Sequence, residues 1–220
     1  MRAFFFSLLF CYSTLLAKGY EPFLSFTASK SELIKIYATH KWLPLSGCHY
    51  YFDPKGCSIT GLVDFKSCAY KVQEDPLMAS QIQWMHVLDP FHFGSHFRCL
   101  REKTCTSTYK QKKYQGIRCC KKQSTKFKTM YADMHNIIPV IGEFRKLRKG
   151  SYFKEPEVAP TIPGIMVRDE AKGMVARTYL YMIDRYDVNS DPELKKMWLR
   201  WHHQHPPTLW EKKKNRLMIN

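Results

Sequence analysis

Seven cysteines that follow an apolar N-terminal segment constrain this chain more than any other feature. Met1-Arg2 makes a short basic start, residues Ala3 to Leu16 are almost unbroken apolar, and Ala17 offers a small residue for cleavage. This pattern is typical of a secretory signal peptide over residues 1–17. The apolar run is too short to span a bilayer. We therefore expect a mature chain over residues 18–220, periplasmic or secreted, that folds where disulfides form and has no integral membrane segment.

The mature chain would keep an odd number of cysteines, namely Cys48, Cys57, Cys68, Cys99, Cys105, Cys119 and Cys120. An even pairing is then impossible, so at least one thiol stays free or pairs with another molecule. The connectivity is not deducible from the sequence. Adjacent cysteines are not a metal pair, so we expect Cys119 and Cys120 to enter two different disulfides or to leave one thiol spare.

The charge balance predicts an anionic partner. Lys and Arg number 35 against 19 Asp and Glu, which gives a formal net charge of +16. Such an excess favours nucleic acid or an acidic membrane surface as the partner and disfavours a metabolic enzyme for neutral substrates. Because 45% of the residues are hydrophobic, the chain can bury a core and is not disordered throughout.

Ten of the basic residues fall in one segment, Arg101 to Lys128, which contains a single acid, Glu102. We expect a solvated, basic excursion there. A charge run is most often simply a solvated face, but aromatic residues interleave with these charges, a mixture that can hold phosphates and stack bases. The nucleic-acid-binding residues predicted from this run are Lys112, Lys113, Arg118, Lys121, Lys122 and Lys126.

The periodicity of apolar residues predicts a helix-rich α+β protein in one domain, mainly helical with a small irregular sheet. Loops and short strands are expected over residues 45–73, and a proline-stiffened connection over 155–163. The main predicted elements are a helix at 27–40, a strand at 82–87 that runs into a loop at Asp89-Pro90, a structured block at 127–141, a helix at 171–186, and a last helix capped by Ser190-Asp-Pro-Glu193 and stopped by Pro206-Pro207.

Two segments carry a resemblance to a known family. They read Gln81-Ile-Gln-Trp-Met-His-Val-Leu-Asp-Pro-Phe-His-Phe-Gly94 and Met130-Tyr-Ala-Asp-Met-His-Asn-Ile-Ile-Pro-Val-Ile-Gly-Glu143. Both resemble the bacterial endonuclease I family, which are periplasmic and secreted nucleases of the ββα-metal, or His-Me finger, class. Further segments in the family's order, at 22–37, 66–72 and 174–182, extend the resemblance over nearly the whole mature chain. The resemblance implies an endonuclease I-like domain over residues 18–220 with a ββα-metal active site.

The resemblance also implies roles for particular residues. His86 matches the histidine that acts as general base toward the attacking water, and a neutral imidazole can take a proton near neutral pH. Asn136 matches the metal-binding asparagine, whose amide oxygen suits Mg²⁺ or another divalent cation. Arg118 is similar to the phosphate-stabilising arginine, and Glu143 would support the site. The stretch at about 100–115 is a basic insertion relative to the family's pattern.

Three of the positions that depart from the family's pattern lie in or next to these two motifs. Met85 stands where the family places the glutamate that binds the metal, and Gln83 replaces the other glutamate of the same motif. Arg145 replaces the asparagine that follows the Gly-Glu pair of the second motif. A thioether is a poor substitute for carboxylate on Mg²⁺. The nearest carboxylates in sequence, Asp89 and Asp133, are the candidate substitute metal ligands.

These observations are compatible with three alternative functions. The first is a secreted or periplasmic, metal-dependent endonuclease that hydrolyses phosphodiester bonds of DNA, with RNA as a further candidate substrate, and with little sequence specificity. The second is a non-catalytic nucleic-acid-binding protein on the same scaffold, its metal site impaired at Met85. The third is a cationic membrane-active protein. Nuclease turnover separates the first from the second, and release of liposome contents would identify the third.

Overall fold

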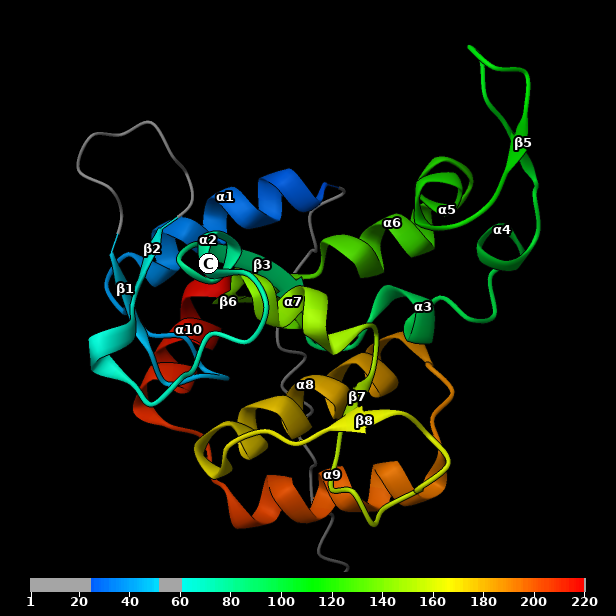
Figure 1. Ribbon diagram of the computed structural model, residues 1–220. Coiled ribbons are helices and arrows are strands. Elements are labelled where there is room, and N and C mark those ends of the chain that lie inside the picture. The colour runs from blue at the N-terminus through cyan, green and yellow to red at the C-terminus, as the bar shows by residue number, and fades with distance from the viewer. Residues whose placement is uncertain (1–24, 52–60, 220) are drawn as a thin grey trace, which may run out of the picture.

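Two antiparallel strands, β3 (Ile82–His86) and β6 (Ile137–Ile141), form a ribbon at the centre of the molecule (Figure 1). All five side chains of β6 are buried, as the apolar run of this strand predicts. Pro139 stands opposite Trp84 in the register. A proline is tolerated there because a two-stranded ribbon has a free edge on each side.

The computed structural model describes residues 25–51 and 61–219. The expected signal peptide and Cys57 therefore lie outside the described residues. Over the described ranges the fold is a mixed α+β single domain, as the sequence predicts. Within the same ranges, no helix is both long enough and apolar enough to cross a membrane.

Helix α7 (Gly142–Arg148) begins where β6 ends and packs on β3, which completes a strand-strand-helix unit. Gly142 makes this close turn possible. A Cβ atom at this position would lie 2.4 Å from the carbonyl oxygen of Met78, so a larger residue would force the backbone apart. The Gly142 N–H also donates to the Gln81 carbonyl at 2.8 Å. This unit places the side chains of α7 beside β3.

Longer helices surround the ribbon. Helices α8 (Asp169–Tyr186) and α9 (Pro192–Gln204) pack side by side (Figure 1), and the rings of Tyr179 and Trp198 stack between them with centroids 4.0 Å apart. Asp191 caps α9 by accepting hydrogen bonds from the first-turn N–H groups. The remaining helices of the described ranges are α1 (Phe26–Tyr37), α2 (Pro76–Ala79), α3 (Pro90–Phe93), α4 (Arg98–Arg101), α5 (Ile117–Gln123), α6 (Thr125–Ala132) and α10 (Leu209–Ile219), with 3-10 turns η1 (Phe65–Ser67) and η2 (Met134–Asn136).

The strands of the described residues form four two-stranded sheets, where the sequence led us to expect one small sheet. Each strand is only two to five residues long and belongs to a separate pair. Besides the central ribbon, the pairs are β1 (His49–Tyr51) with β2 (Leu62–Asp64), β4 (Cys105–Thr106) with β5 (Lys113–Tyr114), and β7 (Tyr152–Phe153) with β8 (Gly164–Ile165).

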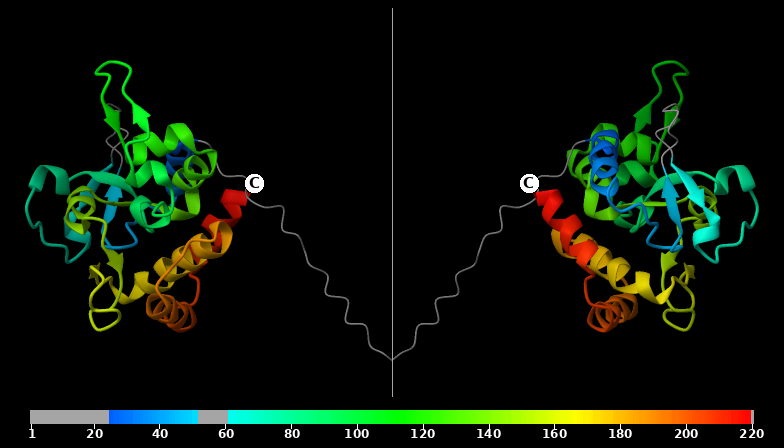
Figure 2. Two further views of the ribbon diagram at one scale, coloured as in Figure 1. Left: turned by 90° about the vertical axis from the view of Figure 1, so that its right-hand side faces the viewer. Right: turned by 90° about the vertical axis from the view of Figure 1, so that its left-hand side faces the viewer.

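Residues 105–114, which we call the basic hairpin, project from the body of the molecule (Figure 2). Two disulfides anchor this region to α5: Cys105 pairs with Cys119, and Cys99 pairs with Cys120. The two adjacent cysteines thus enter different disulfides, as expected. The predicted solvated excursion is confirmed for the hairpin, where Tyr109 is 90% exposed. It is wrong for residues 117–128, because α5 and α6 bury their apolar side against the core.

The helices predicted at 27–40, 171–186 and before Pro206 are confirmed within a few residues. Two details differ. Asp89 begins the short helix α3 where a loop was expected, because its side chain accepts from the Phe91 N–H and caps that turn. A further helix, α10, follows the predicted last helix. Its charged sequence has weak apolar periodicity, so the pattern did not reveal it.

Candidate active site

His86 stands at the end of β3, and its ring is walled by aromatic side chains. The ring centroid lies 4.5 Å from that of Tyr131 on α6 and 5.3 Å from that of Phe26 on α1. Its Nε2 atom lies 2.8 Å from the carbonyl oxygen of Tyr131. A carbonyl only accepts, so Nε2 carries the proton and the neutral ring has its lone pair on Nδ1.

The surroundings of His86 keep its imidazole neutral. Burial lowers the pKa of His86 to about 4. The hydrogen bond to Tyr131 and the charge of Asp89 oppose this shift, whereas the charges of Arg148 and Arg145 add to it. At neutral pH the ring is therefore uncharged with its lone pair on Nδ1, although a pKa this far below 7 makes the imidazole a weak base.

Arg148 holds the backbone that carries His86. This arginine is only 2% exposed, and its guanidinium donates to the carbonyl oxygens of His86, Val87 and Ser151. Arg148 is a residue that the sequence motifs did not reveal. Arg145 and Arg148 lie three residues apart on α7 and share one helix face, and this spacing is the sequence signal that could have identified Arg148.

A cavity of about 190 Å³ lies beside His86. It is large enough for roughly six water molecules, which is ample for a phosphate group and one attacking water. Side chains from β3, α6 and α7 and from the turn that starts α3 come together in its wall, chiefly Met85, His86, Asp89, Tyr131, Arg145 and Arg148. The cavity therefore unites the expected base with two guanidinium groups and one carboxylate.

Asn136 was expected to bind a metal ion, but it lies outside the wall of this cavity. Its side chain is fully buried. The amide oxygen accepts from the Leu88 N–H at 2.7 Å, and the amide nitrogen donates to the Leu88 carbonyl at 3.0 Å. These bonds give Asn136 a structural role in holding the chain that follows His86.

Asp133, one expected substitute ligand, is also committed to structure. Its carboxylate is completely buried; one oxygen accepts from the His135 N–H, and the other from the hydroxyls of Tyr181 and Tyr186. Burial favours a raised pKa, but the hydrogen bonds from His135 and Tyr186 and the nearby His135 hold the pKa of Asp133 below its ordinary value. The prediction that Asp133 replaces the metal ligand therefore does not fit the structure.

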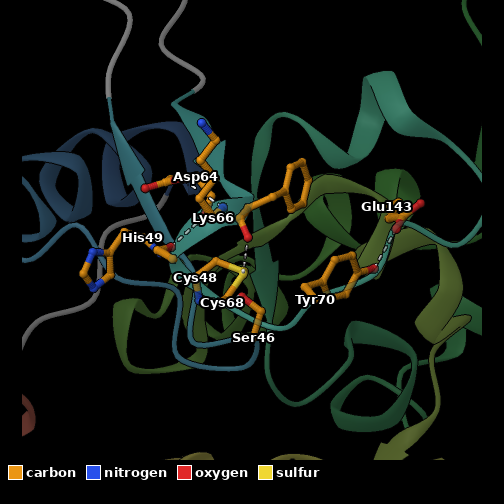
Figure 3. The surroundings of a disulfide bond; sticks show 10 residues. Ser46, Cys48, His49, Asp64, Lys66, Cys68, Tyr70 and Glu143 are labelled. Carbon is orange, nitrogen blue, oxygen red and sulfur yellow. Dashed lines mark hydrogen bonds between the residues drawn. A yellow bond between two sulfur atoms is a disulfide. The ribbon is translucent and has the colours of Figure 1, made fainter.

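Glu143 faces away from the cavity, toward the loop at 70–75. Its carboxylate accepts from the Tyr70 hydroxyl at 2.7 Å (Figure 3) and from the backbone N–H groups of Gln73, Glu74 and Asp75. Burial favours a raised pKa, but these donors lower the pKa of Glu143 to about 2. Glu143 thus ties this loop to α7 and does not line the cavity beside His86.

The loop that Glu143 holds begins at a disulfide. Cys48 and Cys68 are joined close to Tyr70, and Figure 3 shows Ser46 beside this bond. The Ser67 hydroxyl, next to Cys68, accepts from the His49 N–H at 2.7 Å. The disulfide and the Glu143 carboxylate therefore fix opposite ends of one short segment.

The donors of this region do not fit the Mg²⁺ ion that the family resemblance implies. Met85 offers a neutral, soft sulfur, the amide of Asn136 is bonded to Leu88, and the cavity wall has a single carboxylate, Asp89. Arg145 and Arg148 add two positive charges to the same wall. Among residues 25–51 and 61–219, no group of three or more His, Cys, Asp or Glu side chains is placed to hold a metal ion.

The predicted nucleic-acid-binding residues lie on neighbouring elements. Lys121 on α5 contacts the wall of the cavity, because its Nζ lies 4.7 Å from the ring centre of Tyr131. Arg118 and Lys122 flank the ring of Tyr114, at 5.8 and 5.9 Å. Arg118 is exposed and does not itself line the cavity, although its neighbour Ile117 does. The remaining exposed members are Lys112 and Lys113 on the basic hairpin and Lys126 on α6.

Comparison with known proteins finds relatives that share most of the chain's length. The chain is 28% identical over 211 residues to a periplasmic deoxyribonuclease of Aeromonas hydrophila, with 87% of this chain and 79% of that protein covered. The chain is also 28% identical to an extracellular deoxyribonuclease of the same organism, with 87% of this chain and 82% of that protein covered. It is 28% identical to endonuclease-1 of Buchnera aphidicola subsp. Acyrthosiphon pisum, with 89% of this chain and 76% of that protein covered. No family model matches the chain. The similarity over nearly the whole chain, together with the motifs around His86 and Asn136, supports the resemblance of this chain to the bacterial endonuclease I family.

Proposed function

We propose that this protein is a periplasmic or secreted endonuclease that hydrolyses phosphodiester bonds of DNA. The arrangement of His86 carries the proposal: its Nε2–H is fixed on the Tyr131 carbonyl, its Nδ1 lone pair is available, and it borders a cavity rich in positive charge. The names of the relatives, which are periplasmic and extracellular deoxyribonucleases, support the compartment and the substrate. The strand-strand-helix unit of β3, β6 and α7 would be the His-Me finger of this enzyme.

In this proposal His86 is the general base. Nδ1 takes a proton from a water molecule, whose oxygen forms a bond to phosphorus while the bond from phosphorus to the leaving sugar oxygen breaks. The leaving oxygen takes up a proton from solvent. Positive charge in the cavity stabilises the charge that develops on the phosphate oxygens. Because the donor set does not fit Mg²⁺, the proposal contains no step through a metal ion.

DNA would reach the cavity along the basic surface next to it. The six predicted binding residues on the basic hairpin, α5 and α6 contact phosphates in this proposal, and the aromatic side chains between them stack on bases. Phosphate contacts carry no sequence information, so cleavage would have little sequence specificity. RNA presents the same phosphodiester and is a second substrate to test.

Cleavage of supercoiled plasmid by the purified, oxidised protein tests the proposal. We expect wild type to convert the plasmid to nicked and linear forms and His86→Ala to lose this activity. His203→Ala, an exposed histidine on α9, is the matched control and should cleave like wild type. Equal cleavage by His86→Ala and wild type would reject His86 as the base. A labelled single-stranded RNA in the same assay measures the second substrate.

A non-catalytic DNA-binding protein is the second candidate. The observation that favours it is the wall of the cavity, where Met85 stands in place of the expected metal-binding glutamate and Arg145 adds a positive charge. This candidate predicts that the protein binds DNA, that binding falls as salt rises, and that no divalent cation produces cleavage. Plasmid that is retarded on a gel but never cut by wild type would establish it.

A further inference from the structure

Arg145 is the cation of the His86 cavity that remains available to a ligand. The guanidinium of Arg148 is buried and already donates to three carbonyl oxygens. Arg145 is exposed, and its Nη1 donates to Gln83 Oε1 at 3.3 Å. A guanidinium has five N–H donors in a planar fork, so this bond leaves others to face a ligand.

The strand opposite Arg145 does not neutralise it. Gln83 and Met85 are two residues apart on β3, so they share one face of the strand, the face on which Gln83 accepts from Arg145 of α7. Both side chains are uncharged. A carboxylate at either position would form an ion pair with Arg145 and remove its charge from the cavity. With Gln83 the guanidinium is oriented by a hydrogen bond while its charge is kept.

The single carboxylate of the wall is also engaged. Asp89 Oδ1 accepts from the Phe91 N–H at 2.9 Å, a bond that starts α3. The cavity wall therefore holds two guanidinium groups and one carboxylate, and the carboxylate already accepts a backbone hydrogen bond. Such a wall attracts anions and repels divalent cations.

We infer that the cavity beside His86 binds the phosphate of a phosphodiester directly through Arg145, with no divalent cation between protein and ligand. This inference rests on the proposed function, since it names how the same site holds its substrate. A planar fork can donate two parallel hydrogen bonds to two phosphate oxygens, which fixes orientation as well as charge. The phosphate would lie between Arg145 and Nδ1 of His86, where a water molecule can approach phosphorus.

A small probe isolates the cavity from the basic hairpin. We would titrate the full oxidised chain with the dinucleotide thymidylyl-thymidine, which has one phosphodiester, in EDTA, and follow binding by NMR. The variants are Arg145→Gln, which removes the charge, and Arg145→Lys, which keeps the charge but removes the fork. Lys146→Gln, the next residue on α7 and also exposed, is the matched control for loss of one positive charge.

Wild type is expected to bind the dinucleotide in EDTA, and saturating Mg²⁺ should change the affinity less than twofold. Arg145→Gln should weaken binding about tenfold or more, since a charged hydrogen bond is lost. The affinity of Arg145→Lys should lie between those of wild type and Arg145→Gln. The affinity of Lys146→Gln should stay within about twofold of wild type. The amide spectra of the variants report whether each remains folded.

Two results would overturn the inference. One is equal affinity of wild type and Arg145→Gln in EDTA, and the other is binding that begins only when Mg²⁺ is added. Plasmid cleavage, measured in parallel, separates this inference from the proposed function. Binding through Arg145 without any cleavage retains the inference and rejects the enzyme. Mg²⁺-dependent cleavage that Arg145→Gln does not impair retains the enzyme and rejects the inference.

Discussion

The side-chain amide of Asn136 exchanges two hydrogen bonds with the backbone of Leu88, one in each direction. The Val87 N–H also donates to the Asn136 carbonyl at 2.8 Å. These bonds extend the pairing of β3 and β6 past His86. Together with the bonds from Arg148, they fix the backbone on the C-terminal side of His86, so Asn136 holds the chain that carries this histidine and does not line the cavity.

Asn136→Ala should therefore destabilise the protein. Leu88 is 2% exposed, so the substitution leaves a buried N–H and a buried carbonyl without partners. We expect the free energy of unfolding to fall by about 2–4 kcal/mol. Urea unfolding measures this, with Asn189→Ala, an exposed asparagine, as the control. Unchanged stability together with loss of Mg²⁺-dependent cleavage would return Asn136 to the metal-ligand role.

Glu143 should make stability depend on acid. Its pKa of about 2 in the folded protein lies below the ordinary value of 4.5, so the unfolded chain binds a proton first as pH falls. The stabilisation is complete above pH 4.5 and is lost as pH falls from there toward 2. In Glu143→Gln this part of the pH dependence should disappear, and the variant should be less stable at pH 7. Melting temperatures of both proteins across this range provide the measurement; parallel curves would contradict the assignment.

The basic hairpin should contribute to the salt dependence of DNA binding. If the protein contacts about five phosphates, the logarithm of the DNA-binding constant should fall with the logarithm of the salt concentration at a slope of roughly −4.5. Lys112→Gln/Lys113→Gln should make this slope less steep by about 1.8, since two contacts are lost. The matched pair Lys195→Gln/Lys196→Gln on α9 should leave it unchanged. Fluorescence anisotropy over a salt series measures the slope, and a wild-type slope near zero would end the nucleic-acid interpretation.

Features that depend on local sequence could be predicted well. The strand that ends at His86 and the helix at 169–186 follow from apolar periodicity, which adjacent residues determine. The separation of Cys119 and Cys120 into two disulfides follows from their adjacency. Their partners could not be predicted, because they depend on how the hairpin folds back on α5. The roles of Asp133 and Arg148 were missed for a similar reason. Asp133 meets hydroxyls 48 and 53 residues away, and Arg148 acts on backbone carbonyls about 60 residues away.

Arg145 changes what a substitution at Met85 can do. Met85→Glu would return the carboxylate of the family's pattern, but Arg145 lies in the same cavity wall, whereas Asn136 does not. The new carboxylate should form an ion pair with this guanidinium, so Met85→Glu alone should not create Mg²⁺-dependent cleavage. Met85→Glu/Arg145→Asn supplies two oxygen ligands and removes the competing cation. The double variant should cleave faster in Mg²⁺ than in EDTA.

Rates of plasmid cleavage by Met85→Glu, Arg145→Asn, Asp89→Ala and the double variant, each with Mg²⁺ and with EDTA, test this prediction. Arg145→Asn alone is the remaining control, since it removes the guanidinium without adding a carboxylate. Strong Mg²⁺ stimulation of Met85→Glu alone would show that Arg145 does not compete for the carboxylate. Wild-type cleavage that needs Mg²⁺ and is lost in Asp89→Ala would show that Asp89 has become the metal ligand.

The rate of plasmid nicking in EDTA, compared between wild type and His86→Gln, tests the central claim most directly. A glutamine amide can still donate to the Tyr131 carbonyl, so this variant keeps the local structure but cannot act as a base. We predict that wild type nicks DNA in EDTA and that His86→Gln is slower by about a hundredfold or more. Equal rates for the two proteins, or wild-type cleavage that EDTA abolishes, would contradict the account.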